Sequence, residues 1–167
     1  LICVVGLDGV PVVPGPRPSS ELPLHLAVYR SNGAGSVVHT HPPYATAVST
    51  VLDELPAIHY LAAELGGPVR VAPYALFGTD ELAAAASHAL DGRHAVLLAA
   101  HGAVTVGDTV AHAYARSLHL EWLARLHAIA CTMGTPRRLS PTDVEDVATR
   151  LDALAYGASR STSSPLP

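Results

Sequence analysis

The stretch Val37-Val38-His39-Thr40-His41-Pro42-Pro43 carries the clearest structural signal in the chain. Its first five residues are mostly β-branched and favour a short strand over residues 37–41. Proline cannot donate a ladder hydrogen bond but is well tolerated at a helix start, so the two prolines should end the strand and open a helix over residues 43–52. The stretch therefore predicts a strand–helix unit.

The alternation of strands and helices continues on both sides of this unit. Strands are expected at residues 1–5, 56–60, 69–73 and 95–99; the last is wholly apolar and should be buried on both faces. Gly102 should break it, and the strand should resume at 105–106. Cap signals predict helices at 22–30, 80–90, 109–132 and 140–155. This order indicates one layered α/β domain over residues 1–157 with a loose Ser/Pro-rich tail at 158–167.

Composition narrows the class of protein. The 167 residues are 49% hydrophobic and 14% charged, which suits one globular domain with a sizeable core. The net charge of −4 shows no basic stripe, so we expect no nucleic-acid partner. No apolar run reaches the ~20 residues of a membrane span, so we expect no membrane. Isolated Cys3 and Cys131 fit a reducing compartment, and we expect a cytoplasmic protein.

The cations exclude several kinds of chemistry. All ten are arginines, and the chain contains no lysine. Schiff-base catalysis, pyridoxal phosphate anchoring and the P-loop each need a lysine amine and are therefore excluded.

The ten histidines are the informative excess. His39 and His41 should leave one face of their strand, an arrangement that suits a metal but is weak alone, since two structural histidines would look the same. His101, which precedes Gly102 at the end of a buried strand, adds a third imidazole. Three neutral imidazoles would suit a borderline-soft divalent metal with an open coordination position. Four histidines on expected helices are interpreted as structural or solvated, and three more are undecided: His88, His112, His119 and His127, then His25, His59 and His94.

A series of short motifs, in order, resembles the class II aldolase/adducin family over residues 1–157. The series is Ser19-Ser20-Glu21, Val37-Val38-His39-Thr40-His41, Pro56-Ala57-Ile58-His59-Tyr60, the run from Ala72-Pro73-Tyr74 to Phe77-Gly78-Thr79, His101-Gly102 and Tyr156-Gly157. The resemblance implies a layered α/β/α domain with a central, mainly antiparallel sheet. Judged by comparison with the family, we expect the chain to lack an N-terminal segment of roughly fifty residues that supplies part of a phosphate site.

The resemblance also implies a site. His39, His41 and His101 would ligate one zinc ion per chain, and Glu21 would be both a metal ligand and the proton-transferring base. Tyr60, reaching in from a neighbouring subunit of a homotetramer, would be the acid or base at the aldehyde oxygen. The remaining assignments are Ser19 and Ser20 as phosphate-binding residues and Tyr156 as a C-terminal catalytic residue.

Without the resemblance these last residues have ordinary interpretations. Glu21 would be a first-turn glutamate favoured by the helix dipole, Tyr60 a strand aromatic, and the two serines helix caps.

The implied function is that of a zinc-dependent aldolase, which cleaves a short 1-phospho-ketose into dihydroxyacetone phosphate and an aldehyde. The substrate is therefore a phosphorylated small molecule. Without lysine, the available electrophile for carbon–carbon cleavage beside a ketone is a metal. Alternatives are a pentulose-phosphate 4-epimerase, a sugar-phosphate dehydratase or decarboxylase, and an adducin-like binding module without catalysis. Residues 57–60 lack the threonine-histidine-alanine-aspartate stretch of the epimerases, which disfavours that alternative.

Overall fold

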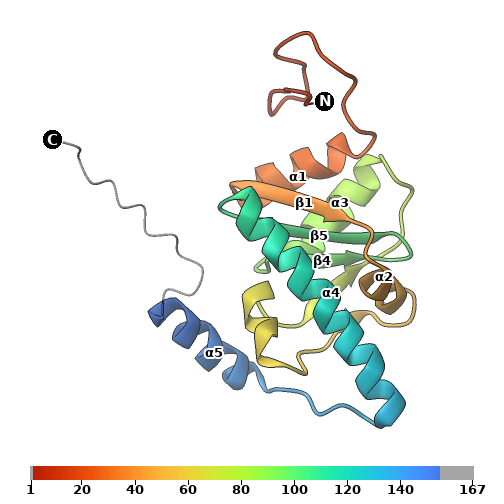
Figure 1. The fold of residues 1–167 in the computed structure, drawn as a ribbon. Coiled ribbons are helices and arrows are strands. Elements are labelled where there is room, and N and C mark those ends of the chain that lie inside the picture. The colour runs from red at the N-terminus through yellow and green to blue at the C-terminus, as the bar shows by residue number, and fades with distance from the viewer. Residues whose placement is uncertain (1, 155–167) are drawn as a thin grey trace, which may run out of the picture.

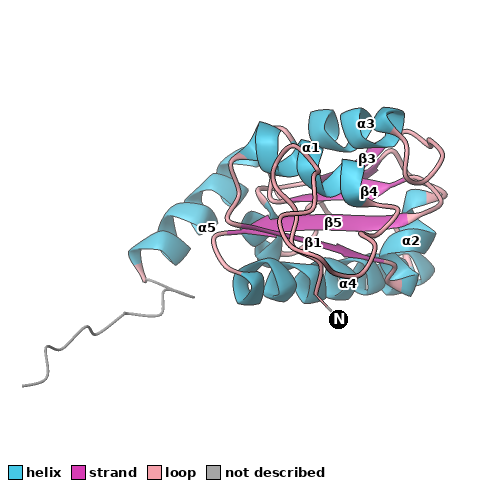
Figure 2. Ribbon diagram, turned by 90° about the horizontal axis from the view of Figure 1, so that it is seen from above, coloured by secondary structure: helices cyan, strands magenta, loops and turns pink. Residues whose placement is uncertain are grey.

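A computed structural model describes residues 2–154 of the chain. Its centre is a single five-stranded sheet with helices on both faces (Figure 1). Viewed from above, α1 and α3 cover one face while α2 and α4 cover the other (Figure 2). This is the predicted α/β/α layering, and the predictions that involve residues 155–167, including Tyr156 and the tail, lie outside the described part.

The sheet has the strand order β1-β5-β4-β3-β2. Only the β3–β4 pair is parallel; the other three pairs are antiparallel, so the expected mainly antiparallel sheet is confirmed. The strands are β1 (Ser36–Thr40), β2 (Glu54–Leu55), β3 (Val69–Ala72), β4 (Ala95–Leu98) and β5 (Gly102–Gly107).

Most of the helices begin where their cap residues predict. Thr79, Thr109 and Ser140 each accept a hydrogen bond from a backbone N–H of the first turn, and Ser140 forms a capping box with Asp143. The elements are α1 (Leu22–Asn32), α2 (Pro43–Ser49), the 3₁₀ helix η1 (Tyr60–Leu65), α3 (Asp80–Leu90), α4 (Val110–Met133) and α5 (Pro141–Ala153). The expected helices at 22–30, 80–90, 109–132 and 140–155 are thus confirmed within the described residues.

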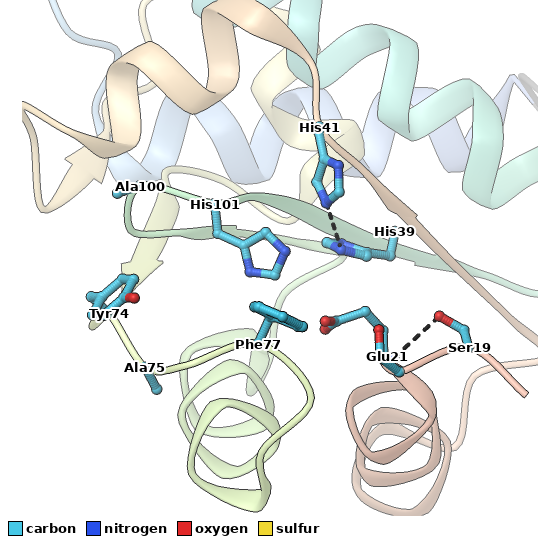
Figure 3. Close-up of a pocket in the computed structure, with 10 residues that line it drawn as sticks. Ser19, Glu21, His39, His41, Tyr74, Ala75, Phe77, Ala100 and His101 are labelled. Atoms are coloured by element: carbon cyan, nitrogen blue, oxygen red, sulfur yellow. Dashed lines mark hydrogen bonds between the residues drawn. The ribbon is translucent and has the colours of Figure 1, made fainter.

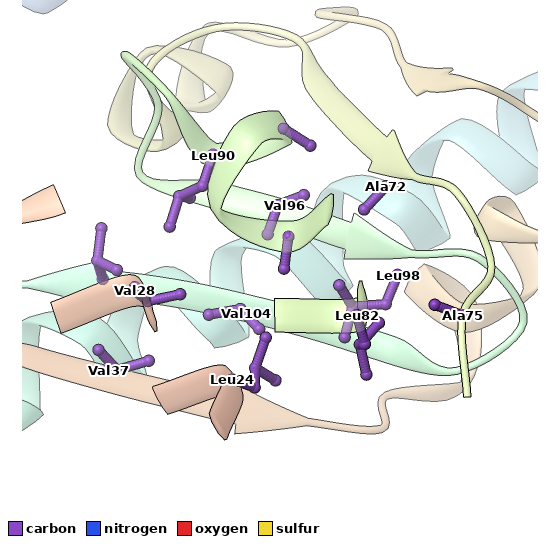
Figure 4. Packing of buried hydrophobic residues seen from close by; sticks show 13 residues of the cluster. Leu24, Val28, Val37, Ala72, Ala75, Leu82, Leu90, Val96, Leu98 and Val104 are labelled. Atoms are coloured by element: carbon purple, nitrogen blue, oxygen red, sulfur yellow. The ribbon is translucent and has the colours of Figure 1, made fainter. Parts of the chain in front are cut away.

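Two hydrophobic cores fill the spaces between sheet and helices. The first lies between the sheet and α1 with α3, and includes Leu24, Leu82 and Val96 (Figure 4). The second lies between the sheet and α2 with α4, and includes Leu97 and Leu120. All four residues of β4 are buried, as its apolar run predicts, because the strand faces both cores.

Two expected strands are wrong. Within the described residues 2–5 only Val5 makes a ladder contact, an isolated bridge to Pro11, because the segment folds into a local loop away from the sheet. Residues 56–60 follow a two-residue strand but pair with no neighbour: the Ala57 carbonyl accepts from Leu139 instead. The His59 ring then caps η1, which begins at Tyr60.

Two element boundaries also differ from expectation. The helix predicted over 43–52 ends at Ser49, where the next N–H groups bond three residues back and tighten the final turn. Gly102 does not interrupt a strand that later resumes. It begins β5, which runs antiparallel to β4 after a tight turn. Among residues 2–154, no helix combines the length and the apolar character that crossing a bilayer would take.

Candidate active site

Three histidines converge from two neighbouring strands. His39 lies on β1, His41 follows the end of that strand, and His101 lies in the turn between β4 and β5. The Nε2 atoms of His39 and His41 are 3.1 Å apart. One ring nitrogen from each of the three lies within 4.8 Å of the others (Figure 3). The structure thus brings together the three histidines that the sequence singles out.

A glycine makes this approach feasible. A Cβ atom at Gly102 would collide with the Thr40 carbonyl oxygen and with the His41 ring. The absence of a side chain lets the start of β5 pass directly beside the end of β1, and this brings His101 to the histidine pair.

The hydrogen bonding and the pKa values of His39 and His101 favour binding of a cation. The Nδ1–H of His39 donates to the Ala103 carbonyl at 2.9 Å, which leaves the Nε2 lone pair facing His41. Burial lowers the pKa of His39 below its usual value, and the neighbouring His101 and His41 lower it further. Burial and the charge of His41 likewise lower the pKa of His101, against the opposing effect of Glu21. Neutral imidazole is the form that coordinates metals.

Glu21 faces the histidines from the start of α1. Its side chain is only 9% exposed, and its Oε2 atom is buried without a hydrogen-bond partner among the described residues. A buried, unpaired carboxylate oxygen is costly unless a cation or proton compensates it. Three imidazoles beside such a carboxylate therefore fit a divalent metal, although the three ring nitrogens alone form the tight ligand group.

These residues line one open cavity of about 510 Å³ (Figure 3). The cavity is lined by Ser19, Ser20, Glu21, His39, His41, Tyr74, Ala75, Phe77, Ala100 and His101. Both serines are exposed. The N–H groups of Glu21 and Leu22 already bond to Ser19, to its hydroxyl and its carbonyl oxygen respectively. The serine hydroxyls, rather than these N–H groups, are thus the polar groups open to an anion.

Four of the lining residues were not assigned a role from sequence: Tyr74, Ala75, Phe77 and Ala100. Tyr74 and Phe77 belong to the loop between β3 and α3, and Figure 3 shows the Phe77 ring between Glu21 and His101. Their signal was the pair of aromatics just after a strand, a pattern that does not reveal which cavity they face. Ala100 has a positive φ of 53°, a conformation that sequence does not announce for alanine.

Tyr60 does not lie in this cavity within its own chain. It begins η1, is 51% exposed, and its ring stacks on His59, which also contacts Trp122. The sequence left open whether His59 neighbours the site, and here it caps η1 instead.

None of the remaining histidines belongs to the metal-binding group. The His25 ring stands edge-on to His39 with 6.5 Å between centroids, but His25 neither lines the cavity nor belongs to the ligand group. The Nδ1 atom of His94 lies 3.1 Å from the Glu64 carbonyl oxygen, so its Nδ1–H tautomer has a structural role as a donor. His88, His112, His119 and His127 lie on α3 and α4, and none of them lines the cavity.

The comparisons with known proteins agree with this geometry. The Class II Aldolase and Adducin N-terminal domain matches residues 1–128. The chain belongs to the class II aldolase and adducin family.

Its relatives include named aldolases. The chain is 36% identical to the 5-deoxy-D-ribulose 1-phosphate aldolase of Bacillus thuringiensis serovar kurstaki over 157 residues, 93% of this chain and 73% of the relative. It is 40% identical to the L-fuculose phosphate aldolase of Escherichia coli K12 over 124 residues, 73% of this chain and 58% of the relative. A solved L-fuculose 1-phosphate aldolase superposes with a TM-score of 0.87 at 35% identity, covering 90% of this chain and 71% of that one. By family and relatives, the chain is a lyase of the class II aldolase type.

Proposed function

We propose that the chain is a zinc-dependent aldolase that cleaves a short ketose 1-phosphate into dihydroxyacetone phosphate and an aldehyde. The observation that carries the proposal is the meeting, in one cavity, of three histidines with a buried carboxylate oxygen that has no partner among the described residues. Imidazole and carboxylate ligands are typical of catalytic zinc, which keeps one position open for substrate. We expect one zinc ion per chain.

His39, His41 and His101 would hold this ion, with Glu21 as a further ligand before substrate binds. A bound divalent cation would supply a Lewis acid that stabilises negative charge on the ketone oxygen as the carbon–carbon bond breaks. The chain has no lysine for the alternative Schiff-base route.

Glu21 would also transfer the proton. After cleavage, the carbon next to the carbonyl carries the electron pair of the broken bond and needs a proton. A carboxylate beside the cavity can deliver it and remove it again in the reverse direction. The Glu21 side chain is only 9% exposed, so few water molecules would compete for this position.

The two serines would recognise the phosphate. Ser19 and Ser20 are exposed at the rim of the cavity, and the positive end of the α1 dipole lies directly behind them. The substrate would resemble those in the relatives' names, a 1-phosphate of fuculose or of 5-deoxyribulose. Tyr156 as a catalytic residue and the cytoplasmic location remain predictions.

The site would be completed by a second copy of the chain in a homotetramer. One face of α4 exposes an apolar stripe at four- and seven-residue spacing, which we call the α4 stripe: Val110, Tyr114, Leu118, Trp122, Ile129 and Met133. Stripes of this length are typical of interfaces between proteins. Tyr60 is exposed; its ring contacts His59, which in turn contacts Trp122 of this stripe. Tyr60 would enter the cavity of a neighbouring subunit as the acid or base at the aldehyde oxygen.

Aldehyde release tests the function. We expect turnover of fuculose 1-phosphate or 5-deoxyribulose 1-phosphate that is lost on chelation and restored by zinc, with the dephosphorylated ketoses cleaved poorly. Equal cleavage of both forms would remove the phosphate assignment. An inert, metal-free but folded chain would favour an adducin-like binding module.

A further inference from the structure

Helix α2 is tied at both ends to the two segments that present metal ligands. It begins at Pro43, two residues after His41, and its last residue, Ser49, contacts the turn that carries His101. Both ties are made by buried or charged side chains. They suggest a bracing role for a helix that contributes no residue to the cavity itself.

The tie to His101 is a single hydroxyl. Ser49 is 4% exposed; its Oγ donates to the Thr46 carbonyl at 2.7 Å and accepts from the Ala100 N–H at 3.1 Å. Ala100 is the only non-glycine residue with positive φ among the described residues. Its left-handed conformation is unfavourable for alanine and persists only where its surroundings hold it.

Backbone hydrogen bonds close this turn around Ala99 and Ala100. The Ala99 N–H donates to Ala72 and the His101 N–H to Leu98, both through backbone carbonyls. The Ala100 N–H has the Ser49 hydroxyl as its partner. The Ser49 hydroxyl is thus the side chain that anchors the residue preceding His101.

The tie to His41 is a carboxylate from α4. The first two free N–H groups of α2 belong to Tyr44 and Ala45, because Pro43 has none. They donate to Oε1 and Oε2 of Glu121 at 3.0 and 2.9 Å. A charged, two-pronged cap of this kind is stronger and more directional than a neutral one. It fixes the start of α2, which begins two residues beyond His41.

We propose that Ser49 and Glu121 are positioning residues of the metal site, which act through α2 to hold His101 and His41 in ligating geometry. The inference rests on the proposed metal site but concerns residues that never touch metal or substrate. Partners that orient metal ligands in this indirect way typically change metal affinity by roughly 10–100-fold when removed.

The chain offers closely matched controls. Thr50, the neighbour of Ser49, also donates its hydroxyl to a carbonyl of α2 at 2.7 Å but makes no hydrogen bond to the turn. Ser140 caps α5, so its loss removes a helix cap away from the histidines. Ala100→Gly offers a rescue, since glycine adopts positive φ without strain.

Zinc titration of the full chain against a chromogenic chelator tests the proposal. We expect Ser49→Ala and Glu121→Ala to raise the zinc Kd at least about tenfold, and Thr50→Ala and Ser140→Ala to leave it within about twofold. Ser49→Ala combined with Ala100→Gly should recover most of the affinity. Wild-type affinity in folded Ser49→Ala and Glu121→Ala proteins would overturn the proposal.

A second measurement separates this proposal from the proposed function. In the zinc-free chain, amide exchange at Ala100 should be slow in the wild type and at least about tenfold faster in Ser49→Ala, with Thr50→Ala unchanged. If the wild type binds no zinc, the aldolase proposal fails while this result still decides the bracing role. Fast Ala100 exchange in the wild type would refute the bracing role by itself.

Discussion

Glu21 is the residue on which the proposed chemistry most depends, because its carboxylate is the proposed proton carrier. We expect Glu21→Gln to give a folded protein that still binds zinc through the three histidines. Its exchange of a methylene proton of dihydroxyacetone phosphate with solvent should fall by roughly a hundredfold or more, since an amide cannot serve as the base. NMR of the exchange in deuterated water measures this. Exchange at the wild-type rate would assign the proton transfer to another residue.

Single residues differ in how far sequence reveals them. The spacing of His39 and His41 and the position of His101 before a glycine predict a metal site from elementary strand geometry. Glu21 becomes visible only through the family resemblance, because a glutamate in a first helical turn is ordinary. Ser49 and Glu121 give no signal at all, since their partners are backbone groups brought near by the fold.

At the scale of elements, the close approach of the end of β1 to the start of β5 depends on Gly102. We expect Gly102→Ala to lower the free energy of unfolding by about 1–3 kcal/mol, because the new methyl group would overlap Thr40 and His41. Zinc affinity should fall as well, since the strain acts on two ligand-bearing segments. Urea unfolding and zinc titration measure the two effects.

Gly92 supplies the control for this prediction. Its φ is positive, unlike that of Gly102, but a Cβ atom at this position would meet nothing within 4 Å. Gly92→Ala should therefore cost only about 1 kcal/mol of backbone strain and leave zinc binding unchanged. Similar zinc affinity in Gly102→Ala and Gly92→Ala would contradict the claim that Gly102 is needed for the close approach of β1 and β5.

The elements that sequence predicted well are those with local signals. Thr79, Thr109 and Ser140 mark helix starts through hydrogen bonds within one turn, and β4 is marked by its apolar run. Residues 1–5 and 56–60 have strand-like composition too. Whether such a segment joins a sheet depends on a partner elsewhere in the chain, and local composition does not contain that information.

At the scale of the whole molecule, stability should depend on histidines that are buried uncharged. Burial, together with the nearby Arg116, lowers the pKa of His94 below its usual 6.5. The folded protein then binds fewer protons than the unfolded chain, so this contribution is present above about pH 6.5 and is lost as the pH falls through the lowered pKa. We expect urea unfolding with chelator present to show lower stability at about pH 5.5 than at about pH 7.5, and a smaller difference in His94→Asn. An unchanged difference would show that His94 does not contribute.

Assembly is tested by complementation between inactive chains. If Tyr60 acts across a subunit boundary, mixed oligomers of Tyr60→Phe and Glu21→Gln chains should regain part of the activity, because some sites combine an intact Glu21 with an intact Tyr60. Subunit exchange is verified with a mass-tagged chain. Verified mixed oligomers without activity would place Tyr60 in its own chain's site or outside the reaction. Leu118→Arg, in the middle of the α4 stripe, should in addition weaken the assembly seen by analytical ultracentrifugation.

The central claim is that His39, His41 and His101 form a metal site, and zinc stoichiometry tests it most directly. Elemental analysis of purified protein should find about one zinc per chain in the wild type and in His119→Ala, whose ring lies on α4 outside the cavity. His39→Ala, His41→Ala and His101→Ala should each lose most of the metal while remaining folded. A folded wild type that takes up no zinc, or triad variants that retain it, would contradict the account.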